Sequence, residues 1–315
     1  MTEQYQGKAA QERASIVIGT RGSPLALAQA RETRSRLLAT ISTLADNDVA
    51  IQTYKTTGDR IQDRSLADSG GKGLFTKEIE DALLSGEIDL AVHSMKDMPT
   101  RLPDGLIMAA YLPREDPRDV LLGARPWTLQ TLPQGAVVGT SSLRRKALLL
   151  VRRPDLQVIE FRGNVETRLR KLQEGVAAAT FLARAGLNRL GITPSGLHIL
   201  SPEEMLPAVA QGAIGIECRA SDTSLLRHLA KLDDAPTRRR VEAERSLLAV
   251  LDGSCRTPIA ALAEIDATGS LRLRAAIAKP DGSVLLETER QGDDGVAMGA
   301  DAGAELRARG GADFF

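Results

Sequence analysis

Two arginine-rich turns carry the side chains with the clearest chemical potential. Residues 139–145 read Gly-Thr-Ser-Ser-Leu-Arg-Arg, and residues 161–170 read Phe-Arg-Gly-Asn-Val-Glu-Thr-Arg-Leu-Arg. Each turn follows a strand-like run and opens a helix-like run. A helix N-terminus attracts anions, and a guanidinium grips a carboxylate or phosphate at two points. The pattern predicts a site for a small molecule with several negative groups, built from Arg144, Arg145, Arg162 and Arg168.

The alternative interpretation of these arginines is a solvated helix face, which is the usual place for a helical arginine. Their position at successive strand-to-helix turns argues against it, because such turns line the ligand crevice of an open α/β sheet. Arg152 and Arg153 fall at the far end of their helix and fit dipole compensation there.

A second candidate group is Lys96-Asp97, at the carboxyl end of the strand-like run 88–92, in a loop shared with His93 and Ser94. A turn residue or helix cap is the alternative for the aspartate. In an arginine-lined pocket, a single carboxylate would be the natural partner for a cationic intermediate or a donor N–H group.

Two further candidates lie in loops. Cys255 stands between Ser254 and Arg256, and the arginine would lower the pKa of the thiol; spacing alone does not assign it a function. Lys72 lies in a run of three glycines and either approaches an anion or is a solvated lysine. Cys218 falls in a strand-like run and is expected to be a buried hydrophobic residue.

Alternating strand and helix patterns position these groups. Ser23 is expected to cap a helix that begins at Pro24, after a strand over 15–20. A loop is expected over 56–59, and a helix that begins near Phe75 should stop at Gly86. Prolines between residues 99 and 117 predict a crossover to a second domain, and Ser201 to Pro207 would return the chain to the first.

The last part of the chain changes character. After a linker over 233–236 we expect a helix over 241–251, strands over 259–265, 271–278 and 284–290, and a final helix of small residues. The fold class is therefore α/β: two βαβ-type domains and a smaller C-terminal α+β domain with a three-stranded antiparallel sheet. The expected boundaries are a disordered N-terminus over 1–14, a first domain over 15–112 and 208–232, a second over 113–207 and a third over 233–315.

Composition excludes several classes of protein. The 41 basic and 41 acidic residues balance, and only 3% of residues are aromatic, so a nucleic-acid partner is not expected. No apolar run is long enough to span a membrane, and residues 1–14 lack an apolar signal core. Two cysteines fit a reducing compartment, so a cytoplasmic location is expected. The three histidines lack metal-ligand spacing with the cysteines, so no metal is expected.

Together, these motifs resemble the porphobilinogen deaminase (hydroxymethylbilane synthase) family. The similarity runs from about Ser15 to near the C-terminus, and its ordered motifs make it specific. The matching segments are 18–27, 70–75, 91–97, 114–119, 138–145, 162–165, 185–190 and 212–218. The chain departs from the family pattern where Gly-Ser precedes Cys255 in place of a glycine pair, and where Ala178 stands in place of an aspartate.

The resemblance implies an enzyme that joins four porphobilinogen molecules head to tail, releases ammonia at each step, and forms hydroxymethylbilane. It also implies a dipyrromethane cofactor in thioether linkage to Cys255, with Asp97 as the catalytic residue. The cofactor- and substrate-binding residues it implies are Arg21, Ser23, Lys72, Lys96, Ser142, Arg144, Arg145, Arg162, Arg168 and Arg189. The chemistry is consistent, because porphobilinogen carries an acetate and a propionate, and loss of ammonia leaves a cationic azafulvene.

The implied fold is a two-lobed arrangement like that of periplasmic binding proteins. The alternative function is therefore a non-catalytic two-lobed protein that binds small carboxylic acids. A binder needs neither a loop thiol in a third domain nor a carboxylate inside a basic cleft, and these two features favour the enzyme. We further expect a monomer, with a possible transient hand-over of product to uroporphyrinogen-III synthase.

Overall fold

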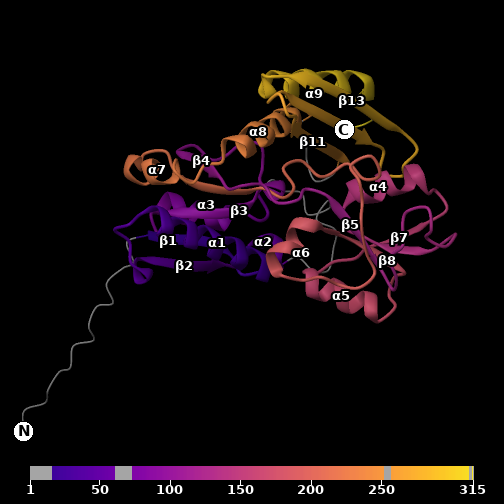
Figure 1. Cartoon of the computed structure of the whole chain (residues 1–315), viewed down its shortest axis with the longest axis horizontal. Coiled ribbons are helices and arrows are strands. Elements are labelled where there is room, and N and C mark those ends of the chain that lie inside the picture. Colours follow the sequence, from indigo (N-terminus) through magenta and orange to yellow (C-terminus); the bar gives the residue numbers. More distant parts are fainter. Residues whose placement is uncertain (1–15, 61–72, 252–256, 312–313, 315) are drawn as a thin grey trace, which may run out of the picture.

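The computed structural model describes residues 16–60, 73–251, 257–311 and 314. Lys72 and Cys255 lie outside these residues, as does the predicted disordered N-terminus. Within the described part of the chain there are two five-stranded mixed sheets and one three-stranded antiparallel sheet. Figure 1 shows the first two sheets and their helices side by side as two lobes, with the C-terminal domain lying across both. The predicted fold class is confirmed.

The first lobe is built on the sheet order β2-β1-β3-β10-β4. Its strands are β1 (Ile16–Arg21), β2 (Val49–Tyr54), β3 (Leu90–Ser94), β4 (Leu106–Tyr111) and β10 (Ile214–Arg219). Its helices are α1 (Pro24–Thr40), α2 (Thr57–Arg60), α3 (Lys77–Ser85) and α7 (Thr223–Leu229). The strand β10 runs antiparallel to both β3 and β4.

The second lobe repeats this plan with the order β7-β6-β8-β5-β9. Its strands are β5 (Asp119–Gly123), β6 (Val137–Gly139), β7 (Gln157–Ile159), β8 (Ala179–Ala183) and β9 (Leu197–Ile199). Its helices are α4 (Leu143–Arg152), α5 (Val165–Gln173) and α6 (Arg184–Leu190). The fourth strand of each sheet, β10 in the first lobe and β5 in the second, runs antiparallel to its neighbours. Each of these strands is the first that the chain forms after it crosses from the other lobe. Two crossovers therefore join the lobes.

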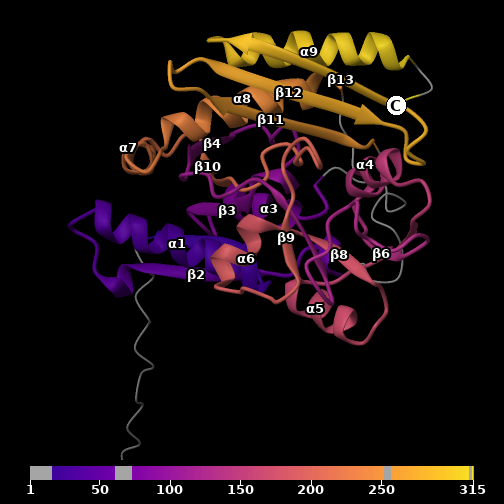
Figure 2. The same cartoon turned by 45° about the vertical axis from the view of Figure 1, so that its right-hand side comes forward.

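The C-terminal domain consists of α8 (Ala235–Val250), β11 (Ile259–Ile265), β12 (Leu271–Ala278), β13 (Leu285–Gly292) and α9 (Gly295–Gly310). Figure 2 shows α8 and α9 on the sheet. The helices approach closely: a Cβ at Gly299 would lie 2.2 Å from the carbonyl oxygen of Ala243, so only glycine fits there.

Both faces of the C-terminal sheet contribute buried residues, chiefly from β11 and β12. On β11, Ala261 and Ala263 pack with α8, whereas Ala260 and Leu262 join the core of the second lobe. This alternation follows from the two-residue period of a strand. The C-terminal domain is therefore packed against the second lobe through a continuous apolar core.

Several local predictions are confirmed. Ser23 caps α1 by accepting from the N–H of Ala26, and Gly86 ends α3 in the left-handed conformation. Cys218 is fully buried, and burial raises the pKa of its thiol to about 11.

Two local predictions are wrong, and a third holds in part. The expected loop over 56–59 includes the helical turn α2, which forms because Asp59 accepts from the N–H and hydroxyl of Thr56. The expected linker over 233–236 includes the start of α8, because Asp234 caps that helix through the N–H of Thr237. The predicted crossover is present between β4 and β5, which belong to different sheets, and Pro113 and Pro117 lie in it. The strand β4 occupies the earlier part of the proline-rich segment.

Candidate active site

A cleft of about 1150 Å³ lies between the two lobes. Its walls come from the ends of β1, β2 and β3 on one side, and from the N-terminal turns of α4 and α5 on the other. The structure brings together in this cleft most residues that the sequence singled out: Arg21, Ser23, Lys96, Asp97, Ser142, Arg144, Arg145, Arg162 and Arg168. Arg189 is outside this lining.

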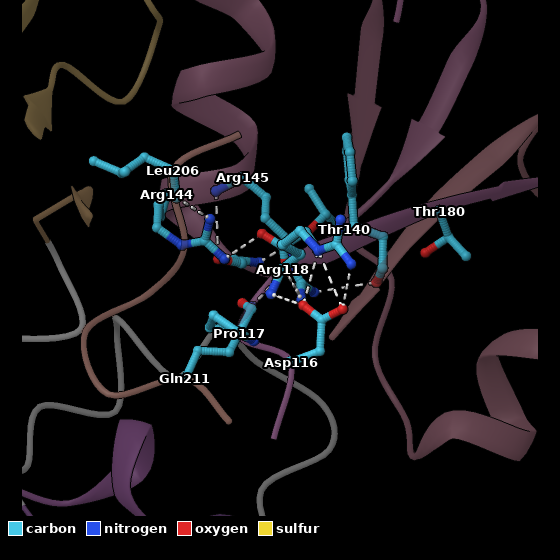
Figure 3. Close-up of polar contacts among 12 residues, drawn as sticks. Asp116, Pro117, Arg118, Thr140, Arg144, Arg145, Thr180, Leu206 and Gln211 are labelled. Atoms are coloured by element: carbon cyan, nitrogen blue, oxygen red, sulfur yellow. Dashed lines mark hydrogen bonds and ion pairs between the residues drawn. The ribbon is translucent and has the colours of Figure 1, made fainter. Parts of the chain in front are cut away.

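Arg144 and Arg145, labelled in Figure 3, are both buried. Both contact one carboxylate, that of Asp119. Arg144 Nη2 lies 2.8 Å from Asp119 Oδ2, and Arg145 Nη2 lies 2.7 Å from Oδ1. Gln211 also donates to Oδ1, at 2.9 Å. Burial alone would raise the pKa of Asp119, but the two guanidinium groups hold it well below its ordinary value.

Two guanidinium groups and one carboxylate leave this buried trio with one net positive charge. Two further donors are satisfied locally: Arg144 Nη1 donates to the carbonyl of Leu206 and Arg145 Nη1 to that of Phe181. Arg144 Nε is buried and has no hydrogen-bond partner among the described residues. The side chain of Ser142 caps α4 by accepting from the N–H of Arg145. The trio is therefore fixed in place as a preorganised anion-attracting surface.

Arg162, in the turn before α5, and Arg168, within α5, extend this positive surface. Arg168 donates to the carbonyl of Gly163 at 2.9 Å, and no carboxylate lies within ion-pair distance of it in the described part of the chain. Burial and the neighbouring charge of Arg145 lower the pKa of Arg168 to about 10. Arg162 lies 3.4 Å from Glu160. Arg168 therefore retains a charge that a bound anion could neutralise.

On the opposite wall, Arg21 is held by two contacts. Its guanidinium forms an ion pair with Asp59 and lies 4.2 Å from the centroid of the Phe75 ring. Burial opposes ionisation of Asp59, but hydrogen bonds from Arg21 and Thr56 lower its pKa overall. Neither Asp59 nor Phe75 was predicted from the sequence as a site residue.

Asp97 ends the 3₁₀ turn η3 (Met95–Asp97), directly after β3, and it lines the cleft together with Lys96. The side chain of Lys96 is exposed to the solvent in the cleft, but the surrounding protein limits the hydration of its ammonium group. This desolvation, with the charges of Arg145 and Arg144, outweighs Asp97 and Asp119 and lowers the pKa of Lys96 to about 8. The lysine is therefore poised to lose its charge just above neutral pH.

Behind Asp97, a smaller recess of about 70 Å³ is lined by His93, Ser94 and Gln29 among others. His93 Nε2 lies 2.9 Å from Oε2 of the fully buried Glu217, and Ser94 exchanges hydrogen bonds with Gln29. These contacts fix the end of β3 from which Asp97 projects.

Arg189 lies where the two lobes meet. It donates to the carbonyl of Gly212 at 2.9 Å and lies 3.6 Å from Glu32 of α1. Burial lowers its pKa. The resemblance implies a ligand-binding role for Arg189, which stays a prediction; in the structure this residue connects α6 with α1 and the second crossover.

The comparisons with known proteins agree with one another. The family model of the porphobilinogen deaminase dipyrromethane cofactor binding domain matches residues 16–227, and that of the porphobilinogen deaminase C-terminal domain matches residues 238–308. A Paracoccus denitrificans porphobilinogen deaminase is 59% identical over 302 residues, covering 95% of this chain and 96% of its own. A chloroplastic porphobilinogen deaminase of Oryza sativa is 56% identical, covering 97% and 87%.

Solved structures match less closely. A periplasmic substrate-binding protein of a Coxiella burnetii ABC transporter is 14% identical with a TM-score of 0.41, covering 71% of this chain and 94% of its own. A periplasmic VFT2 domain of Bordetella pertussis BvgS is 15% identical with a TM-score of 0.40, covering 69% and 86%. Among the described residues, no helix is long and apolar enough to cross a membrane.

Proposed function

The chain belongs to the porphobilinogen deaminase family, and from that premise we propose how its residues condense four porphobilinogen molecules into hydroxymethylbilane for tetrapyrrole biosynthesis. The observation that carries the proposal is the interlobe cleft, where a net-positive cluster of arginines shares one cavity with Asp97. The two-lobed binding-protein alternative is not favoured, because the family match extends through the C-terminal domain.

The cofactor of this family is dipyrromethane, and we propose that Cys255 holds it by a thioether. The residues that the structure describes fit such a group: the cleft has room for a short pyrrole chain, and the trio of Arg144, Arg145 and Asp119 has an excess positive charge. Acetate and propionate groups would be bound by these arginines and by Arg168. When bound, dipyrromethane supplies the pyrrole end to which the first substrate is joined.

Asp97 is the catalytic residue in this proposal. Its carboxylate stabilises the positive charge that develops on porphobilinogen as ammonia leaves, and it accepts from pyrrole N–H groups. Preorganised electrostatic stabilisation of this kind contributes roughly 10²–10³ in rate. Lys96 binds a substrate carboxylate beside Asp97, and Arg21 does so from the opposite wall.

Supporting contacts complete the assignment. Ser23 and Ser142 each cap a helix whose N-terminus faces the cleft, and we propose that they help to bind carboxylates there. We keep Lys72 as a binding residue from its motif position and Arg189 as one near the contact between the lobes.

The organisation of the chain is part of the proposal. We place the first domain at 15–112 and 208–232, the second at 113–207 and the third at 233–315, which the membership of strands in the three sheets supports. We also propose a cytoplasmic monomer that passes its product transiently to uroporphyrinogen-III synthase.

Intact mass and turnover of porphobilinogen together test this function. The wild-type chain should carry one dipyrromethane of excess mass, the Cys255→Ser variant should lack it, and only the wild type should release ammonia at a normal rate. The Asp97→Asn variant should fold and load the cofactor but turn over at least about 100-fold more slowly. An unmodified and inactive wild-type chain from a host that makes porphobilinogen would overturn the proposal.

A further inference from the structure

The turn that carries Asp97 is anchored in the C-terminal domain as well as in its own lobe. Met95 and Met98, on either side of the Lys96-Asp97 pair, are 1% and 4% exposed. Both belong to the apolar cluster formed by α8 and the C-terminal sheet, with Val241 and Leu247 among its members. The position of the Asp97 turn therefore depends on where α8 lies.

Arg245 of α8 makes the polar half of this connection. Its Nη1 donates to the carbonyl of Met98 at 3.3 Å, and its Nη2 donates to the carbonyl of Pro99 at 2.6 Å. These are the two carbonyls that directly follow Asp97 in the chain. In the part of the chain that the structure describes, Arg245 has no carboxylate within ion-pair distance, so these carbonyls are its main partners.

Burial lowers the pKa of Arg245, against the opposing influence of Tyr111. A guanidinium that loses hydration without gaining a counterion must recover the cost through its hydrogen bonds. The fork of an arginine meets two adjacent carbonyls with a fixed geometry that a lysine cannot reproduce. The contact is thus suited to holding the backbone after Asp97 in one place.

We propose that Arg245 is a positioning residue for Asp97, which fixes the turn Met95–Asp97 against the helix that leads to Cys255. The helix α8 ends at Val250, five positions before that cysteine. The helix that contacts the Asp97 turn is thus the one that precedes the proposed attachment residue in the sequence. This inference rests on the proposed function, because it takes Asp97 as the catalytic residue.

Arg245→Ala tests the inference, with Arg245→Lys as a second variant. We expect Arg245→Ala to retain the excess mass of one dipyrromethane, to lower kcat by about 10- to 100-fold, and to change KM by less than about threefold, since a misplacement of 1 Å can cost about 100-fold. Hydrogen exchange of residues 95–100 should become faster. Arg245→Lys should recover part of kcat, because it restores the charge and one donor.

Arg240→Ala is the matched control. Arg240 lies on the same helix, but its Nε donates to the carbonyl of Pro236 within that helix, so kcat and exchange at 95–100 should remain as in the wild type. The inference is overturned if Arg245→Ala folds and keeps kcat within twofold, or if it loses the cofactor mass. If Arg245→Ala does not fold, a folded Arg245→Lys variant with wild-type kcat and exchange overturns it as well. A failure of the proposed function would differ, because the wild type itself would then lack cofactor mass and turnover.

Discussion

Arg144 and Arg145 are oriented before a ligand arrives, because Asp119 and two backbone carbonyls already hold their guanidinium groups. Donors fixed in this way need no reorganisation when an anion binds. The sequence predicted the arginines from their place at a strand-to-helix turn. It did not predict Asp119, because the carboxylate that contacts these arginines depends on how α4 packs against β5 and β8. These elements are separated in the sequence and come together only in the fold.

Replacing Asp119 tests this arrangement. Asp119→Asn would leave two buried guanidinium groups with less countercharge, so the free energy of unfolding should fall by about 3–5 kcal/mol. Urea unfolding at pH 7 measures the change. Asp116→Asn is the control, because its partner Arg118 is 43% exposed, and it should cost less than about 1 kcal/mol. Equal losses in the two variants would contradict the account.

The same carboxylate predicts a dependence of stability on pH. Since the pKa of Asp119 is lower in the folded protein, its contribution is fully present above the unfolded value of about 3.9. The contribution is lost as pH falls below that value toward the folded pKa. Wild-type unfolding free energy should therefore drop more steeply below pH 4 than that of Asp119→Asn, and parallel curves in acid would be evidence against the ion pair.

Lys96 gives a prediction for activity instead of stability. Because its pKa is about 8 in the free cleft, its positive charge is present below pH 8 and is lost as pH rises through that value. The KM for porphobilinogen should therefore rise between pH 7.5 and 9, as measured by initial rates. Lys96→Arg keeps its charge over this range and should show a smaller rise. A KM that is independent of pH in the wild type would exclude a charged Lys96 from substrate binding.

At the scale of elements, the two crossovers decide how the lobes meet. The second crossover passes Gly212, which has a φ of +88° and packs directly on the first crossover. A Cβ on this glycine would lie 2.4 Å from the carbonyl oxygen of Glu115. Neither backbone segment can move away easily, because Glu115 N–H donates to the carbonyl of Gly212 at 3.2 Å.

Gly212→Ala should therefore destabilise the protein by more than the roughly 1–3 kcal/mol expected from a left-handed backbone alone. Gly135→Ala is the matched control: its φ of +69° imposes the same conformational strain, but no atom lies within 4 Å of the added Cβ. Thermal unfolding of both variants provides the comparison. If Gly212→Ala costs no more than Gly135→Ala, the crossovers are not tightly packed.

Much of the element order could be predicted from the sequence. The bounds of β11 and β12 match, because each is a strand-like run rich in apolar residues and turns at Gly269 and Gly282 follow them. The start of α8 was not predicted, because Asp234 and Pro236 are compatible with two structures. They could form a linker, or they could be a helix cap followed by a proline in the first turn. Only the tertiary contacts decide between those two interpretations.

At the scale of the whole molecule, the three parts share cores instead of meeting through thin interfaces. The C-terminal sheet contributes one face to the core of the second lobe and the other to a cluster that includes Met95 and Met98 of the first lobe. Figure 1 shows this domain spanning both lobes. The C-terminal domain therefore supports both lobes through shared apolar cores, although none of its described residues lines the cleft between them.

We propose that porphobilinogen units are added, in this cleft, to a pyrrole chain that is covalently attached to Cys255. The most direct measurement is intact mass, with peptide mapping, after limiting porphobilinogen is mixed with the holoenzyme. The account predicts a ladder of discrete increments, each equal to porphobilinogen less ammonia, all on the peptide that contains Cys255. An absence of increments in a folded, cofactor-loaded enzyme, or increments on another peptide, would contradict it.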